Sequence, residues 1–353
     1  MSFHPSVLAT KDLGYLRDSL HAVGYRTDAL AANLGLSNAE ALLADVARNS
    51  FIYSDSLQHS PVDILFNLFL FCAPVSMDAF FALPKRLTRE LLEHNLVRVE
   101  SEGGLVIGNV TISEINGCLY LADRLFENRL GTIKLTFSSD SCMPPHVSSF
   151  ELMQAISSGC SSPAVLDVGC GSGCLTLPLA RSAGVAVGID INDRAVEFAR
   201  INAALNGMQV GFEHVEWENF LPDRRYDHIV FNAPNANSAF AFLAGGIPRL
   251  LATGGRAHIW LWCEVLASDG GVQGTVSRLA NIDPAISLRI VANDDSPFSL
   301  SRHAITAGER PWRTLLVERT SDWPSYIDSL RRRGVIEVVS LVLEISNSEH
   351  SPH

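Results

Sequence analysis

Glycines at alternate positions follow an apolar segment near the middle of the chain. The segment Ala164–Val168 is apolar around Asp167 and predicts a strand that runs directly into a helix. Between them the sequence reads LDVGCGSGC, in which three glycines alternate with other residues: Gly169, Gly171 and Gly173. Glycine lets the backbone turn sharply and lets a bound molecule lie against it. The motif predicts a nucleotide-type cofactor beside this turn.

An acidic residue ends the next predicted strand. Val187–Ile189 is followed by Asp190, about twenty residues after the glycines, where an acid in this topology bonds ribose hydroxyls. The pattern leaves two cofactor classes, nicotinamide dinucleotides and S-adenosylmethionine. Dinucleotide sites usually carry GxGxxG, whereas these glycines alternate and Asp167 precedes them. A carboxylate there would repel a pyrophosphate and suit an ammonium group, so the residues favour S-adenosylmethionine.

The elements that must position these residues form two predicted domains. A length of 353 residues suggests two domains, and the Ser- and Pro-rich segment 138–149 (SSDSCMPPHVSS) has no periodicity. We therefore place an N-terminal domain at 1–137, a linker at 138–150 and a cofactor-binding domain at 151–353. In the last part, strands alternate with helices at 164–168, 175–181, 185–189, 194–205, 210–214 and 226–231. Such alternation predicts an α/β, Rossmann-like, doubly wound, mostly parallel sheet.

The N-terminal part is predicted to be mainly helical. Helical periodicity appears in short pieces within 9–49, from Pro61 to Phe71, from Ser76 and over Leu87–Asn95, before strand candidates at 96–100, 105–108, 110–115 and 118–122. Helices followed by a two-stranded wing resemble a winged-helix module, which raises a DNA-binding alternative. The helix near Leu87–Asn95 carries both Arg and Glu, so we favour a substrate-binding or dimerisation domain.

The amino-acid composition narrows the kinds of partner and ligand that the protein is expected to bind. The 27 Lys and Arg against 38 Asp and Glu give a net charge of −11, which disfavours broad nucleic-acid binding. The seven cysteines show no CxxC pair and no signal peptide precedes them, so we expect reduced thiols in a cytoplasm. The histidines show no HExxH or HxxxH spacing, and no apolar run is long enough to cross a membrane. We therefore expect neither a bound metal nor a membrane partner.

With these motifs in order, the sequence resembles the class I S-adenosylmethionine-dependent methyltransferases. The matching stretch runs from about residue 163 to 260 and contains VLDVGCGSG, VGID, VEWENF and FNAPN. Within that family it resembles the "small" N-methyltransferase branch, whose last motif is usually Asn-Pro-Pro-aromatic. The layout also resembles a two-domain bacterial group of these enzymes. The resemblance implies a seven-stranded sheet and S-adenosylmethionine as the cofactor.

The resemblance also implies roles for individual residues. The three glycines and Cys170 would form the loop under the cofactor, with Asp167 near its methionyl part. Asp190, followed by Ile191, would hold the ribose. Glu216 occupies the place of an acid that contacts the adenine amino group, and Trp217 beside it would cover the base.

The last motif departs from the family pattern. It reads Asn232, Ala233, Pro234, Asn235, and the resemblance makes the Asn232 side chain and the Ala233 carbonyl the two acceptors for the target amino group. Asn232 would thus serve both the acceptor and the cofactor side of the site. The aromatic residue is replaced by Asn235, which forfeits roughly 1 to 3 kcal/mol of stacking on a planar base.

The expected function is methyl transfer to a nitrogen or oxygen of a small molecule such as an amine or amino acid. One alternative is methylation of RNA or of a protein Gln or Asn side chain. Another is transfer of a different group of the cofactor, or its cyclisation, with release of methylthioadenosine. A last one is a non-enzymatic S-adenosylmethionine-sensing DNA binder. The expected partners are a small-molecule substrate and a second copy of the chain, and His146 in the linker is a candidate base.

Overall fold

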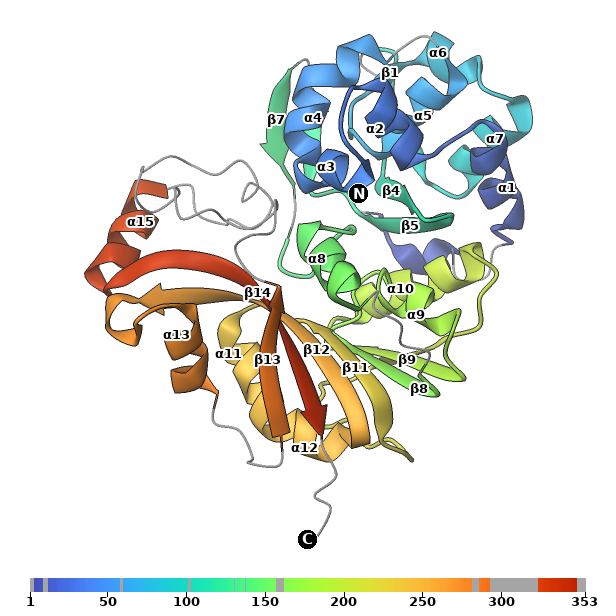
Figure 1. The fold of residues 1–353 in the computed structure, drawn as a ribbon. Helices are drawn as coiled ribbons and strands as arrows, with labels where there is room; N and C mark the ends of the chain where they lie inside the picture. The colour runs from blue at the N-terminus through green and yellow to red at the C-terminus, as the bar shows by residue number, and fades with distance from the viewer. Residues whose placement is uncertain are drawn as a thin grey trace, which may run out of the picture. The chain divides into compact units, whose positions relative to one another are not determined.

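A computed structural model describes residues 3–8, 12–57, 60–100, 103–129, 131–136, 138–156, 162–280, 286–292 and 323–347 (Figure 1). The chain divides into two compact units. Unit 1 comprises Met1–His146, Gly171–Cys174 and Asn192–Gln209, and unit 2 comprises Val147–Cys170, Leu175–Ile191 and Val210–His353.

Unit 1 is mainly helical and contains three small sheets. Its helices are α1 (Gly14–Ala22), α2 (Thr27–Asn33), α3 (Ala39–Ala44), α4 (Val46–Tyr53), α5 (Pro61–Phe69), α6 (Met77–Phe81), α7 (Lys85–Glu93) and α10 (Asp193–Leu205). Its strands are β1 (Val75–Ser76), β2 (Val97–Glu100), β3 (Leu105–Gly108), β4 (Val110–Ile115), β5 (Cys118–Asp123), β6 (Phe126–Arg129) and β7 (Thr132–Leu135). The strands pair as β1-β3-β2, β4-β5 and β6-β7.

Capping residues set the starts of the helices that the sequence predicted here. Ser60 and Asp63 form a reciprocal capping box before Pro61, the first residue of α5. Ser76 accepts the Ala79 N–H at the start of α6. Because these signals lie within four residues of each helix start, the sequence alone located α5 and α6.

Unit 2 is built on a seven-stranded sheet of order β10-β9-β8-β11-β12-β14-β13. The five strands from β10 to β12 are parallel, and β14 pairs antiparallel with both β12 and β13. The strands are β8 (Ala164–Val168), β9 (Val185–Asp190), β10 (Gly211–His214), β11 (Tyr226–Asn232), β12 (Leu251–Leu266), β13 (Ile286–Ala292) and β14 (Val335–Asn347). This mixed, mostly parallel sheet confirms the predicted Rossmann-like class.

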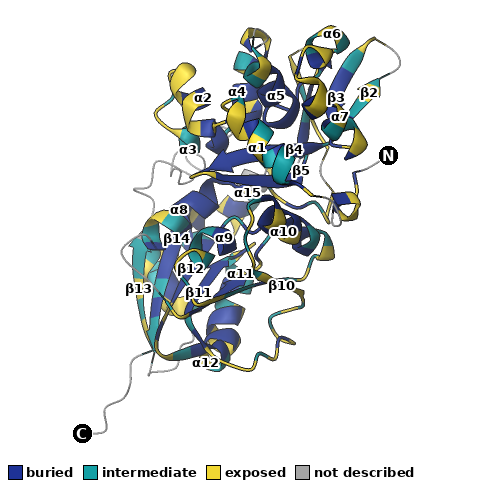
Figure 2. Ribbon diagram, turned by 90° about the vertical axis from the view of Figure 1, so that its right-hand side faces the viewer, coloured by how far each residue is buried: buried dark blue, intermediate teal, exposed yellow. Residues whose placement is uncertain are grey.

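Helices of unit 2 cover opposite faces of its sheet. They are α8 (Val147–Ile156), α9 (Thr176–Ala180), α11 (Ala236–Ala241), α12 (Ile247–Leu250), α13 (Val272–Leu279) and α15 (Trp323–Arg332). Along β12, Ile259 and Leu261 join the core with residues of α11 to α13, whereas Trp260 between them bonds to Glu151 of α8. Side chains of a strand alternate between faces, so α8 lies on the other side from α11 to α13. Figure 2 shows strands of this sheet buried, as double coverage requires.

The compact units differ from the predicted domain limits in two places. Helix α8 begins at Val147, inside the stretch interpreted as a linker. Its Ser148, which suggested a linker in the sequence, accepts a hydrogen bond from the Asn232 side chain within unit 2. Residues 171–174 and 192–209, expected in the cofactor-binding domain, cluster with unit 1 because α10 is hydrogen-bonded to β5. The chain passes between the units several times, which a division into consecutive domains cannot represent.

A buried histidine pair crosses the sheet of unit 2. His228 Nε2 lies 2.9 Å from His258 Nδ1, and His258 Nε2 lies 3.4 Å from the Glu344 carboxylate, which also receives two bonds from Arg289. Donation by His258 Nε2 to Glu344 makes its Nδ1 an acceptor for His228. Burial lowers the pKa of both histidines, that of His228 to about 3. Both rings are therefore neutral in the folded protein near neutral pH.

Acid should destabilise the protein through this pair. The pKa of His228 is lower in the folded state than its usual value of 6.5, so its stabilising contribution is complete above pH 6.5 and is lost as the pH falls towards 3. We expect the free energy of unfolding to fall by about 1 kcal/mol per pH unit between pH 6 and 4. Urea unfolding at several pH values measures this slope. In His228→Gln, whose side-chain amide can still donate to His258, the slope should be smaller; an equal slope would show that other groups cause it.

Candidate functional site

The glycine turn leaves β8 in a conformation that other residues rarely adopt. The angle φ is positive at all three glycines: Gly169 (65°), Gly171 (54°) and Gly173 (80°). A Cβ added at Gly171 would meet no atom of the described residues within 4 Å, so the backbone conformation rather than crowding requires glycine there. The alternating pattern in the sequence thus corresponds to alternating left-handed residues, which turn the chain sharply at the end of a parallel strand.

The start of the turn is held against β9. Cys170 N–H donates to the Ile189 carbonyl at 3.0 Å. A Cβ added at Gly188 would lie 2.9 Å from Cys170 Cβ and 2.7 Å from a ring carbon of Phe212, closer than such atoms approach. Gly188 is therefore required for this close approach. The sequence motif VGID did not reveal this role, since glycine in a strand signals a close contact only after its neighbours are known.

Asp167 lies in β8 with its carboxyl group completely buried. The Thr176 hydroxyl at the start of α9 donates to its Oδ2 at 2.5 Å, while Oδ1 has no partner among the described residues. Burial, and secondarily the charge of Asp190, raise the pKa of Asp167 to about 7. A neighbouring positive charge would favour its ionised form, as the prediction of an ammonium partner requires.

Asp190 ends β9 at the same edge of the sheet. Its carbonyl accepts the Val215 N–H at 3.0 Å, which fixes the end of β9 beside the end of β10. Ile191 follows with 66% of its surface exposed, and its carbonyl lies 3.0 Å from the His214 ring nitrogen. Because β10, β9, β8 and β11 are adjacent and parallel, their carboxyl ends bring these predicted residues to one edge of unit 2.

The two residues predicted at the adenine differ in their surroundings. Glu216 is exposed, and the Asn219 side chain donates to it at 3.3 Å. Trp217 packs edge-on against Phe242 with ring centroids 5.3 Å apart, and a Cβ at Gly245 would lie 3.3 Å from its ring. Packing therefore accounts for much of the Trp217 surface, and its contact with a base stays a prediction.

Asn232 is the last residue of β11, and two serines of α8 bind its amide nitrogen. Nδ2 donates to Ser148 Oγ at 2.9 Å and to Ser149 Oγ at 3.4 Å. The next residue, Ala233, donates its N–H to the Trp260 carbonyl at 3.0 Å. Both amide hydrogens are thus used inside unit 2, which leaves Oδ1 as an acceptor.

A buried carboxylate supports this arrangement from behind. Glu151 of α8 accepts from the Trp260 indole N–H and from the Ser340 hydroxyl at 3.2 Å. Trp260 lies opposite Asn232 in the register of β11 and β12. Ser148, Ser149 and Glu151 were not predicted from the sequence: the two serines fall within the predicted linker 138–150, and Glu151 is the first residue after it. The apolar spacing of Val147, Phe150 and Ile156 was the available signal for a helix.

The end of the motif is a helix start. Pro234 is exposed, and the Asn235 side chain accepts the Ser238 N–H at 2.9 Å as the N-cap of α11. Asparagine is among the residues favoured at an N-cap, where an aromatic residue cannot make this bond. The departure from the family pattern therefore has a structural reason.

His146 belongs to unit 1 and is buried. Its Nε2 has no partner among the described residues, and burial lowers its pKa to about 4. The ring is neutral at physiological pH and so retains the lone pair that a base requires.

The sequence also led to expectations about the cysteines, metal-binding side chains and membrane-spanning segments. The six described cysteines are free thiols: Cys72, Cys118, Cys142, Cys170, Cys174 and Cys263. No cluster of three or more potential metal-binding side chains occurs in the described part of the chain. Over the same residues, every helix is too short or too polar to cross a membrane. Cys160 lies outside the described residues.

Residues 161–269 match the family model of a methyltransferase domain. An uncharacterised RNA methyltransferase of Gloeobacter violaceus is 46% identical over 71 residues, which are 20% of this chain and 16% of that protein. A ribosomal protein L11 methyltransferase of Neisseria meningitidis is 43% identical over 126 residues (34% and 39%), and a ubiquinone biosynthesis O-methyltransferase of Actinobacillus pleuropneumoniae is 32% identical over 78 (22% and 33%). The chain thus spans well under half of each relative.

Among solved structures, Trm5b of Pyrococcus abyssi superimposes with a TM-score of 0.41 at 18% identity, covering 71% of this chain and 62% of that one. The family match and these relatives show that residues 161–269 are similar to methyltransferase domains, in agreement with the expected class I S-adenosylmethionine-dependent fold. They confirm the predicted enzyme class and the predicted cofactor.

Loss of the Asn235 cap should destabilise α11. We expect Asn235→Ala to lower the free energy of unfolding by about 1 kcal/mol, and Asn235→Ser to retain most of it, because serine can make the same bond. Thermal unfolding of both variants measures the difference. Equal stability of Asn235→Ala and the parent protein would argue against a structural role and leave Asn235 as a residue for the substrate.

Proposed function

We propose that the protein transfers the methyl group of S-adenosylmethionine to a nitrogen or oxygen of a small molecule. The observation that carries the proposal is the Asn232 amide, whose nitrogen is bound by serines so that Oδ1 remains an acceptor at the end of β11. With the Ala233 carbonyl it offers two acceptors to an N–H or O–H group. Such bonds orient a lone pair, and orientation is the main requirement of an in-line methyl transfer.

The residues of the turn fit the expected cofactor. S-adenosylmethionine carries a sulfonium and an ammonium group, and Asp167 offers a buried carboxyl oxygen without a partner in the described ranges. Asp190 at the end of β9 suits the ribose hydroxyls. Positive φ angles at the glycines turn the backbone so that a ligand can lie along it. When bound, the cofactor supplies the electrophilic methyl carbon, and these residues bind and orient it.

Charge supports a small acceptor over a nucleic acid. Elements α5, β1, α6, α7, β2 and β3 follow in the order of a winged-helix module, and their strands pair as β1-β3-β2. In α7, Arg86 and Arg89 lie 3.9 and 3.8 Å from Glu90 and Glu93, and Arg86 also stacks on Tyr15. Arginines interspersed with acids on the same helix make a surface of mixed charge, which is a poor phosphate-binding surface. We therefore assign the N-terminal module to substrate binding or homodimer formation.

RNA or protein methylation is the second candidate. The relatives named for RNA and for ribosomal protein L11 favour it, as does the relation of the Asn232 motif to N-methyltransferases. Release of methylthioadenosine is the third. Product analysis after incubation with metabolite pools separates these functions: S-adenosylhomocysteine with a small methylated product supports the proposal, methylated RNA or protein supports the second, and methylthioadenosine supports the third.

Asp190 should contribute to cofactor affinity. Asp190→Ala removes a charged acceptor worth about 1.5 to 3 kcal/mol, so we expect binding of S-adenosylmethionine to weaken by about 10- to 100-fold. Calorimetry measures the affinity. Asp193→Ala, which removes an exposed acid three residues later, is the matched control and should change it little. Unchanged affinity in a folded Asp190 variant would remove that residue from the site.

Asn232 should orient the acceptor more than it binds the donor. Asn232→Ala removes one of two acceptors, and the misalignment should lower turnover by about 100-fold with little change in cofactor affinity. Ser148→Ala frees the amide to rotate and should lower turnover about tenfold, whereas Ser149→Ala, with its longer contact, should have a smaller effect. Steady-state kinetics with the identified acceptor tests this order. Comparable losses in turnover and in cofactor affinity would mean that Asn232 belongs to the donor side.

A further inference from the structure

Two asparagines of α10 bond to the backbone of β5. Asn202 Nδ2 donates to the Leu121 carbonyl at 2.9 Å, and its Oδ1 accepts the Leu121 N–H at 2.8 Å. Asn206 repeats the pattern with Leu119, at 2.8 and 2.9 Å. Each side chain thus replaces a residue of a neighbouring strand by bonding one peptide N–H and one peptide C=O. These four bonds join α10 to β5 within unit 1.

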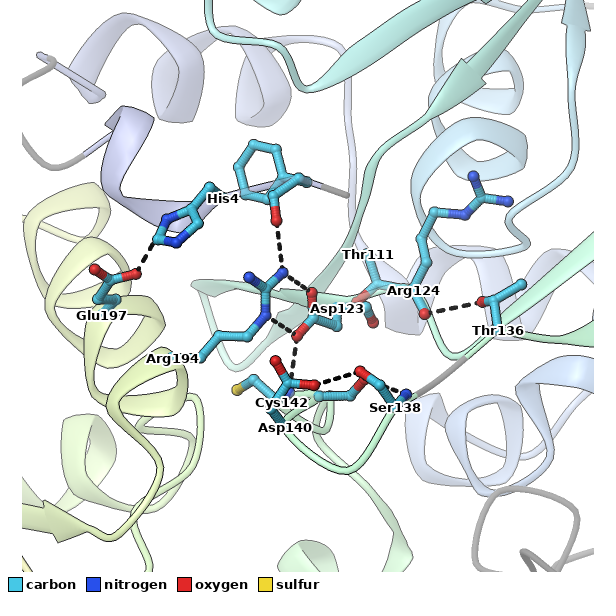
Figure 3. A network of polar contacts seen from close by, with 12 residues as sticks. His4, Thr111, Asp123, Arg124, Thr136, Ser138, Asp140, Cys142, Arg194 and Glu197 are labelled. Carbon is cyan, nitrogen blue, oxygen red and sulfur yellow. Dashed lines mark hydrogen bonds and ion pairs between the residues drawn. The ribbon is translucent and has the colours of Figure 1, made fainter. Parts of the chain in front are cut away.

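The spacing of the two elements makes this pairing possible. Residues four apart in a helix are separated by about 6 Å along its axis, and residues two apart in a strand by about 6.6 Å. The spacing along the helix therefore matches that along the strand, so Asn202 lies beside Leu121 and Asn206 lies beside Leu119. At the other end of α10, Arg194 binds Asp123, the last residue of β5, as Figure 3 shows. The whole helix is consequently fixed along the strand.

Asn202 makes one bond that Asn206 does not. Its amide nitrogen also donates to the Ser172 carbonyl at 2.9 Å, in the middle of the glycine turn. The corresponding hydrogen of Asn206 bonds instead to the Asn202 carbonyl in its own helix at 2.8 Å. Asn202 is completely buried, as is Ser172 at 1% exposure. Both amide hydrogens of Asn202 and its oxygen are therefore used, and one hydrogen is directed at the turn.

Such a contact helps to order the turn, because two of its residues are glycines. Ser172 lies between Gly171 and Gly173, which have no side chains to pack and which lose more conformational entropy on ordering than other residues. Cys170 at the start of the turn bonds to β9. The Ser172 carbonyl is fixed by Asn202, further along the turn.

We propose that Asn202 is a positioning residue for S-adenosylmethionine. It holds the peptide of Ser172 in the conformation that the cofactor meets, and it links that peptide to β5 of the N-terminal part. The proposal rests on the cofactor site proposed above. It adds that the strength of cofactor binding depends on a residue that need not contact the cofactor and that belongs to unit 1.

The pair Asn202→Ala and Asn206→Ala tests this assignment, because both lose the bonds to β5 and only the first loses the bond to the turn. By calorimetry, Asn202→Ala should bind S-adenosylmethionine and S-adenosylhomocysteine about tenfold more weakly, the effect of one lost hydrogen bond, and Asn206→Ala should bind within about twofold of the parent. In the cofactor-free proteins, hydrogen exchange at residues 171–174 should be faster in Asn202→Ala alone. The KM for the cofactor should rise while turnover at saturation changes little.

The outcomes are distinguishable. Equal weakening by both variants, or unchanged exchange at 171–174 in Asn202→Ala, would overturn the positioning role and leave both asparagines as structural. If Asn202→Ala does not fold, the isosteric pair Asn202→Asp and Asn206→Asp replaces it, with the same expected difference. Failure of the parent protein itself to bind S-adenosylmethionine would refute the proposed function instead, since these binding measurements need no acceptor.

Discussion

The hydrogen bond from Cys170 N–H to the Ile189 carbonyl is the constraint on which the candidate site depends. It holds the first residues after β8 against β9, and Gly188 makes that approach sterically possible. One such bond contributes only about 0.5 to 1.5 kcal/mol, comparable to the entropy that a single glycine loses on ordering. A turn with three glycines therefore needs more than one attachment. Asn202 at Ser172 supplies another attachment of the loop on which the cofactor is expected to lie.

The sequence predicted the elements that carry local signals. Pro61 with its capping Ser60, the period of the helices and the glycines after β8 fixed the positions of α5, α10 and the turn to within a few residues. The strand and helix alternation after residue 164 predicted the mostly parallel sheet, because parallel strands buried on both faces are short apolar runs separated by helices. Each of these inferences depends on neighbours in sequence, and the structure agrees with it.

The parts that the sequence did not predict depend on contacts between distant residues. Ser148 and Ser149 look like linker residues, yet one face of α8 meets the amide of Asn232, 84 and 83 residues further along the chain. Asn202 has the polar character of an exposed helical position, although it is completely buried against β5. In the sequence, a buried asparagine with all its hydrogen bonds satisfied is the same residue type as an asparagine exposed to solvent. Periodicity cannot distinguish them.

The electrostatics of the site bear on the class of acceptor. Three adjacent strands bring acidic residues to this edge: Asp167 lies in β8, Asp190 ends β9 and Glu216 follows β10. The edge proposed to bind the cofactor is therefore rich in carboxyl groups. The raised pKa of Asp167 shows what burying a carboxyl group beside another costs in the absence of a positive charge. A cationic cofactor reduces that cost, and so does an amine that approaches Asn232, whereas a phosphate would increase it. The carboxyl groups that would favour the cationic donor would also disfavour a polyanion beside it, which is in keeping with the proposal of a small amine or alcohol as the acceptor.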